Sequence, residues 1–153
     1  MKIDLEEVSF RYGWCEGSLP PPYYYEYTIE VGPGSTGQIE LCMGYSAGDA
    51  PRWRKSFKAK GKQLQSLYTL MTHAGVFTRQ WKSPEFPPVG GSSQWLKVKR
   101  GEEEVEVPSH VEEGGSLKEL YEAIGGLVPP WVWFRGRIWL WLRRRRSRGN
   151  LPG

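Results

Sequence analysis

The feature that most constrains the fold is an alternation of apolar and polar side chains between residues 23 and 45. Successive side chains of a strand point to opposite faces of a sheet, so this pattern predicts two half-buried strands. The first strand places these residues on one face: Tyr23, Tyr25, Tyr27, Ile29 and Val31. The tract 33–37, rich in glycine, predicts a turn, after which these residues resume the alternation: Ile39, Leu41, Met43 and Tyr45.

This pattern predicts a hairpin register in which Val31 lies opposite Ile39 and Tyr25 opposite Tyr45. A slip by one residue would turn the whole apolar set toward solvent, so the faces are strongly specified. A further strand is expected over 52–60.

A second hairpin is expected around a turn at residues 100–103. Its register places Val98 opposite Val105 and Leu96 opposite Val107. The same register sets Lys97 and Lys99 opposite glutamates, which favours the pairing electrostatically.

Two amphipathic helices are predicted. The first covers residues 62–75, and its buried stripe consists of Leu64, Leu67, Tyr68 and Met71. The second begins at a capping box, Ser116 to Glu119, and ends at Gly125. Both helices share the pattern L-x-x-L-Y. This pattern indicates either a duplicated strands-then-helix unit or the shared need of any helix that covers a sheet.

The predicted fold class is therefore α+β, with an antiparallel sheet of five to six strands and two to three helices packed on one face. We expect a single domain over residues 1–142, followed by a basic, flexible tail at 143–153. Between them, the tryptophan-rich segment 131–142 favours a helix with a stripe through Trp131, Phe134, Ile138 and Trp141/Leu142. Packed on the sheet, this stripe would be core; exposed, it would be an interface.

An excess of positive over negative charge occurs in two blocks of the chain. Residues 52–82 carry eight basic and no acidic groups, and residues 135–153 carry seven arginines and no acid, whereas the whole chain has a net charge of +4. In the first block the basic side chains that share one strand face, together with a nearby tryptophan, predict a surface for single-stranded nucleic acid. These candidate binding residues are Arg52, Arg54, Lys58, Lys60 and Trp81. The alternative is that the stripe neutralises Glu26, Glu30 and Glu40 on neighbouring strands.

The second block contributes four consecutive candidate binding residues: Arg143, Arg144, Arg145 and Arg146. A terminal run of like charge is often only solvated. Its other roles would be to bind an anionic membrane surface, nucleic-acid phosphates or an acidic protein.

Catalytic chemistry has no signature in this sequence. His73 and His110 are the only histidines and match no catalytic or metal-binding spacing, so we expect neither an enzyme, nor a metal, nor a cofactor. A secretory signal and a transmembrane segment are not expected either, and Cys15 and Cys42 should be reduced thiols of a soluble, cytoplasmic protein.

The function predicted from these features is a non-enzymatic binding module for nucleic acid or another polyanion. The alternative is a protein–protein interaction module, such as an inhibitor or regulator, that uses exposed aromatics at Trp14, Tyr23 and Tyr24.

Overall fold

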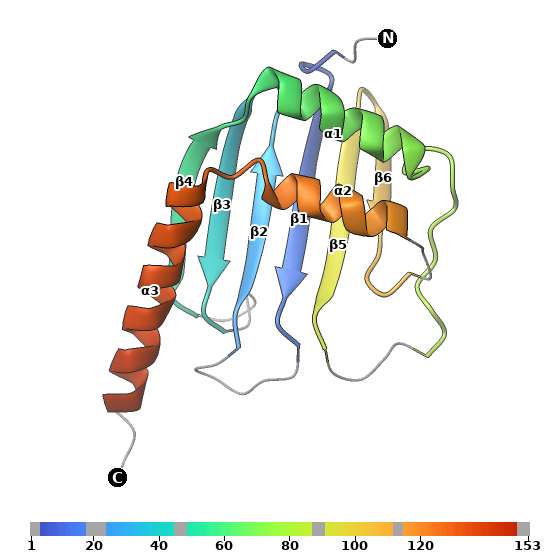
Figure 1. The fold of residues 1–153 in the computed structure, drawn as a ribbon. Coiled ribbons are helices and arrows are strands. Elements are labelled where there is room, and N and C mark those ends of the chain that lie inside the picture. Colours follow the sequence, from blue (N-terminus) through green and yellow to red (C-terminus); the bar gives the residue numbers. More distant parts are fainter. Residues whose placement is uncertain (1–3, 18–23, 45–48, 87–90, 112–114, 150–153) are drawn as a thin grey trace.

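Six strands form one antiparallel sheet in the order β4-β3-β2-β1-β5-β6 in the computed structural model, which describes residues 4–17, 24–44, 49–86, 91–111 and 115–149 (Figure 1). The strands are β1 (Val8–Cys15), β2 (Glu26–Val31), β3 (Thr36–Cys42), β4 (Arg52–Lys58), β5 (Ser93–Arg100) and β6 (Glu103–Val107). The helices are α1 (Gly61–His73), α2 (Gly115–Gly125) and α3 (Pro130–Gly149). The α+β class and the antiparallel sheet are confirmed.

The β2–β3 hairpin has the predicted faces but not the predicted register. Ile29, not Val31, lies opposite Ile39, and Val31 lies opposite Gly37. The prediction was wrong by two residues because it assigned Gly37 to the turn. In the structure Gly37 belongs to β3, and the ring of Phe57 occupies the space that a side chain at Gly37 would need. A shift by two residues preserves the alternation, so the apolar set still faces the core. The proposed partner Tyr45 lies outside the described residues.

The β5–β6 hairpin has the predicted register. Val98 lies opposite Val105 and Leu96 opposite Val107. At the turn, Arg100 forms an ion pair with Glu103 at 2.9 Å.

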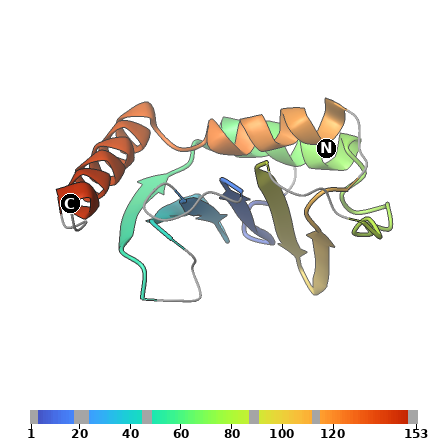
Figure 2. The same cartoon turned by 90° about the horizontal axis from the view of Figure 1, so that it is seen from below.

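Helices α1 and α2 lie side by side on one face of the sheet (Figures 1 and 2). The predicted stripe of α1 is buried in full: Leu64, Leu67, Tyr68 and Met71. Helix α2 begins at Gly115, one residue before Ser116, so Ser116 lies inside its first turn and is not its cap. Because α1 follows four strands and α2 follows two, the two strands-then-helix units differ in size.

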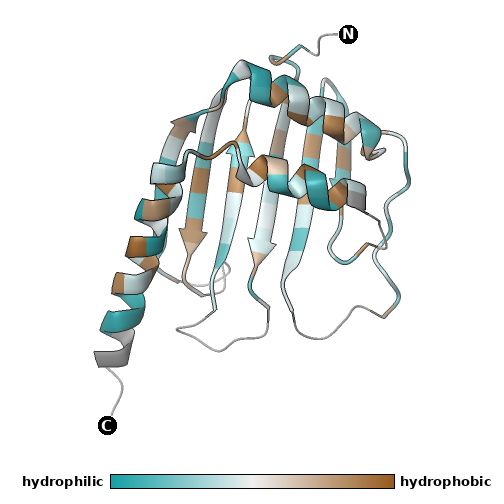
Figure 3. Cartoon of the chain, in the orientation of Figure 1, coloured by the Kyte–Doolittle hydropathy of each residue, from teal (hydrophilic) through white to brown (hydrophobic). Residues whose placement is uncertain are grey.

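The core fills the layer between the sheet and the two helices, where the strands are most hydrophobic (Figure 3). Strand residues such as Ile29 and Leu96 and helix residues such as Leu120 are fully buried there. Among the described residues, no helix lies on the other face of the sheet (Figure 2). That face carries charged side chains, and Arg11 and Lys97 lie over the ring of Trp95 there.

Helix α3 runs along the β4 edge of the sheet, and its C-terminal end projects beyond the strands (Figure 1). The predicted helix over 131–142 therefore exists, and it continues through the arginine run 143–146. The proposed tail at 143–153 thus begins as helix, and residues 150–153 lie outside the described part of the chain.

Candidate functional site

Arg52 and Arg54 lie on the helix-free face of β4, and both contact Glu40 of β3. Arg52 Nη1 donates to Glu40 Oε1 at 2.6 Å, and Arg54 Nε donates to the second carboxylate oxygen. Burial alone would raise the pKa of Glu40, but the hydrogen bonds from these guanidinium groups lower it below its usual value. Two of the candidate binding residues are therefore already engaged with a neighbouring glutamate.

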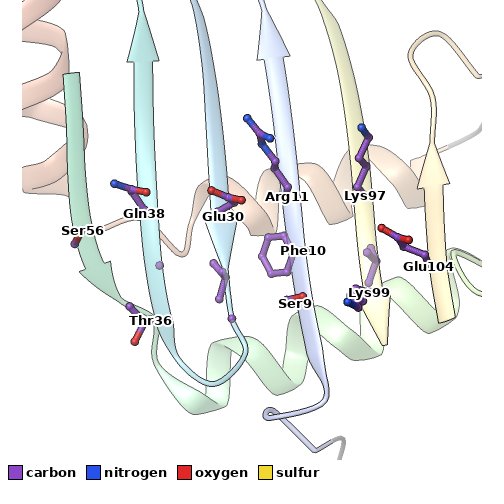
Figure 4. Close-up of a pocket in the computed structure, with 14 residues that line it drawn as sticks. Ser9, Phe10, Arg11, Glu30, Thr36, Gln38, Ser56, Lys97, Lys99 and Glu104 are labelled. Atoms are coloured by element: carbon purple, nitrogen blue, oxygen red, sulfur yellow. The ribbon is translucent and has the colours of Figure 1, made fainter. Parts of the chain in front are cut away.

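The helix-free face carries charges of both signs (Figure 4). Arg11, Lys97 and Lys99 face a hollow of about 540 Å³, and Glu30 and Glu104 lie on the neighbouring strands of the same hollow. Basic and acidic side chains thus lie on neighbouring strands of this face, so its positive charge is divided into small groups. A long phosphate backbone on this face would meet carboxylates as well as cations.

The remaining candidates of the first basic block lie apart. Lys58 is exposed at the end of β4, and Lys60 is exposed just before α1. Trp81 follows the opposite end of α1, where its Nε1 donates to the backbone oxygen of Val76 and Arg79 lies over its ring. The structure therefore does not bring Trp81 together with the β4 residues.

One side of α3 is packed against the sheet. Val132 and Leu140 are buried, and Gly136 faces Leu41 and Trp53. A side chain at Gly136 would lie 2.5 Å from Leu41 Cδ1, so glycine is what allows the helix to approach this closely.

The opposite side of α3 is an apolar ridge that faces solvent. We define the ridge as Trp131, Phe134, Ile138, Trp141 and Leu142, which are between 42% and 65% exposed. These positions repeat at the spacing of one helix face. They form the stripe predicted from the sequence, and their exposure shows that this stripe is not part of the core.

Arginines surround the ridge, and α3 contains no acidic residue. Arg135 and Lys55 of β4 both lie over the ring of Trp131, at 5.4 and 5.5 Å from its centre. Arg145 lies 5.4 Å from the ring centre of Trp141. Arg146 is exposed, and Arg143 and Arg144 are half-buried. The four arginines predicted as contacts thus share one helix with the exposed aromatics.

The aromatics proposed for a protein interface are not the exposed ones. Tyr24 is only 5% exposed, and Trp14 is half-buried against Tyr25 and Tyr27, so the expectation that they are exposed is wrong. The pairing of β1 continues to Cys15, past the glycine at which a loop was expected, and this continuation turns Trp14 toward the helix side. Tyr23 lies outside the described residues.

No protein-family model and no curated protein matches the chain. Within the described ranges, no helix combines the length and apolar character that crossing a membrane requires. In the same ranges, histidine, cysteine and carboxylate side chains form no cluster of three or more suited to a metal ion. Cys15 and Cys42 are free thiols.

Proposed function

We propose that this protein is a non-enzymatic binding module that docks on an anionic membrane surface through α3. The observation that supports this most is the exposed apolar ridge, bordered by arginines on a helix without a single acidic residue. Helices that lie in the membrane interface combine an apolar face with basic flanks in this way. In this arrangement Trp131 and Trp141 occupy the headgroup level, and the arginines contact lipid phosphates.

The apolar ridge should contribute more to the free energy of membrane binding than any single arginine does. Three half-exposed aromatic side chains, at about 150–250 Å² each, offer roughly 400 Å² of surface. Withdrawal of apolar surface from water is worth about 25 cal/mol per Å², whereas an arginine near an anionic membrane adds about 1 kcal/mol. Binding should therefore weaken with salt but persist in part.

Nucleic acid, the first partner suggested by the basic blocks, fits this surface less well. Two of the five ridge residues, Ile138 and Leu142, are aliphatic and offer no ring for a base to stack on. Arg52 and Arg54 are engaged with Glu40 and are less available to phosphates. Binding dominated by phosphate contacts would also fall steeply with salt.

A protein partner is supported by the same ridge, because exposed apolar patches of several hundred Å² mark interaction surfaces. The surrounding arginines then require an acidic partner surface. Such a partner would form a complex of fixed stoichiometry without lipid.

The two free cysteines support a cytoplasmic location, where thiols stay reduced. In that compartment α3 would meet the inner leaflet, which carries the anionic lipids.

Co-sedimentation with vesicles tests the membrane proposal. The purified chain is mixed with phosphatidylcholine vesicles, with and without phosphatidylglycerol, across a range of salt concentrations. We expect binding to the anionic vesicles, and the double variant Ile138→Ser/Leu142→Ser should weaken it about tenfold at every salt concentration. Arg145→Gln/Arg146→Gln should weaken it mainly at low salt.

The matched control is Phe86→Ser, because Phe86 is 84% exposed but lies far from α3 in the sequence and outside the ridge. This variant should bind like the parent protein. Absence of vesicle binding at low salt would overturn the proposal. If single-stranded DNA or RNA then binds with a steep salt dependence, the nucleic-acid hypothesis replaces it; a stoichiometric complex with an acidic protein favours the alternative.

A further inference from the structure

A second feature of the molecule is an open pocket of about 940 Å³ on the helix side of the sheet. Helices α1 and α2 cover only part of that side, and α3 lies along its β4 edge (Figure 1). The pocket lies in the angle between them. Residues from the sheet, the α2–α3 connection and α3 line it: Trp14, Tyr25, Tyr27, Leu41, Gly125, Gly126, Val128, Pro130, Trp133, Phe134, Arg137 and Leu140.

Aromatic rings that brace one another form the floor of the pocket. Trp14 stacks on Tyr27 with ring centres 5.2 Å apart, and it lies 5.1 Å from the ring of Tyr25. Trp133 of α3 meets Tyr27 edge-on at 5.1 Å, and its Nε1 donates to the backbone oxygen of Gly125 at 3.0 Å. These contacts keep the walls in place without a ligand, as in most small-molecule sites.

The charged groups at this pocket are cationic. Arg137 lines it, and the guanidinium of Arg144 lies 5.3 Å from the ring centre of Tyr25. No aspartate or glutamate is among the lining residues just named. Burial is the main cause that raises the pKa of Tyr25. The negative charge of Glu16, which is not a lining residue, raises it further.

The tyrosines of the floor stay protonated at neutral pH. Burial raises the pKa of Tyr27 to about 12, so its hydroxyl carries no negative charge that could repel an anion. The pocket therefore offers a flat apolar floor with positive charge at one side.

From this geometry we propose that the pocket binds a small amphiphilic anion with a flat apolar body and a single acidic group. The body lies on Trp14 and Tyr27 and against Phe134, and the acidic group is bound by Arg137. Arginine suits this role because its planar fork matches the oxygens of a carboxylate or sulfonate. The inference does not rest on membrane docking, although one residue, Phe134, belongs both to the ridge and to the pocket lining.

Two fluorescent probes that differ only in one anionic group test the proposal. They are 1-anilinonaphthalene-8-sulfonate and the uncharged N-phenyl-1-naphthylamine, each titrated into the full chain. We expect saturable one-to-one binding of the sulfonate, about tenfold tighter than binding of the neutral probe, because charge-assisted hydrogen bonds are strong. Arg137→Gln should remove most of this difference, whereas Arg146→Gln, an exposed arginine outside the lining, should preserve it.

A second pair of variants separates the pocket from the ridge. Phe134→Ser should weaken both probes, since Phe134 lines the pocket, and Trp141→Ser should change neither, since Trp141 belongs to the ridge alone. Circular dichroism checks that each variant is folded. Loss of probe binding in Trp141→Ser but not in Phe134→Ser, or equal affinity for the two probes in the parent protein, overturns the proposal. Vesicle binding can fail while probe binding persists, so the two proposals are tested separately.

Discussion

Gly136 is the residue at which α3 comes closest to the sheet. A Cβ there would lie 2.5 Å from Leu41 Cδ1 and 3.1 Å from the ring of Trp53. Both contacts are side-chain atoms of strand residues, so either the Leu41 side chain or the helix would have to shift. The position of this glycine thus determines how the ridge and the pocket are presented on either side of α3.

Gly136→Ala should therefore destabilise the fold, although alanine favours a helix by about 1 kcal/mol over glycine. Overpacking commonly costs about 1–3 kcal/mol, and urea denaturation should show a net loss in the free energy of unfolding. Gly61→Ala is the matched control, because a Cβ at that helical glycine meets no atom within 4 Å. An increase in stability for Gly136→Ala would contradict the close packing.

Glu40 makes the stability of the fold depend on pH. Its pKa is lowered in the folded state by Arg52 and Arg54, against the effect of burial. A carboxylate whose folded-state pKa lies below the unfolded value stabilises the fold at higher pH and loses this contribution as the pH falls through the folded pKa.

We therefore expect the free energy of unfolding to fall more steeply below pH 4.5, the ordinary value, in the parent protein than in Glu40→Gln. Urea titrations at about pH 7 and about pH 3 measure the difference, since the contribution of Glu40 is fully present above the unfolded value and declines as the pH falls below it. Glu119→Gln, a change at an exposed position of helix α2, serves as the control. Parallel pH profiles for Glu40→Gln and the parent would mean that the two arginine contacts contribute nothing.

At the scale of elements, the two hairpins show what a sequence pattern can determine. The β5–β6 register was predictable because apolar pairs and charge pairs agreed on one alignment, with Val98 opposite Val105. The β2–β3 faces were predictable, but the register was not. Gly37 decides this register. It lies in β3 with the ring of Phe57 from β4 in the place of a side chain, and a local sequence pattern does not reveal that contact.

Helix α3 has two parts that differ in their packing. The residues that pack α3 most closely on the sheet, Val132, Gly136 and Leu140, all precede residue 143, whereas the arginine run beyond them adds the contact of Arg144 with the ring of Tyr25. Truncation after Leu142 should therefore preserve the fold. The far-ultraviolet circular dichroism spectrum should lose only the contribution of the helical turns that were removed.

The same truncation should weaken binding to anionic vesicles and reduce its dependence on salt, because each arginine near the surface adds about 1 kcal/mol. Co-sedimentation at several salt concentrations gives both values. Loss of the folded state on truncation would instead show that the arginine run belongs to the domain, contrary to the predicted boundary at residue 142.

For the whole molecule, the α+β class followed from the strand alternation and the two helix stripes, because both periods match elements that need a shared core. The candidate site could not be predicted from the sequence in the same way. Segment 131–142 is apolar on nearly every side, so its sequence could not show which side packs on Leu41 and which faces water. By contrast, neutralisation of the basic stripe by glutamates of neighbouring strands was one of the two alternatives that the sequence offered, and the structure shows it for Arg52 and Arg54, with Glu40 as the partner.

The order of the strands also gives the sheet two unlike edges. β4 carries basic side chains at Arg52, Arg54, Lys55 and Lys58, whereas three of the five residues of β6 are glutamates. Two copies that met through the same edge would oppose like charges, which disfavours strand pairing. The outer strands therefore disfavour symmetric sheet extension through either edge, and α3 lies along the β4 edge (Figure 1).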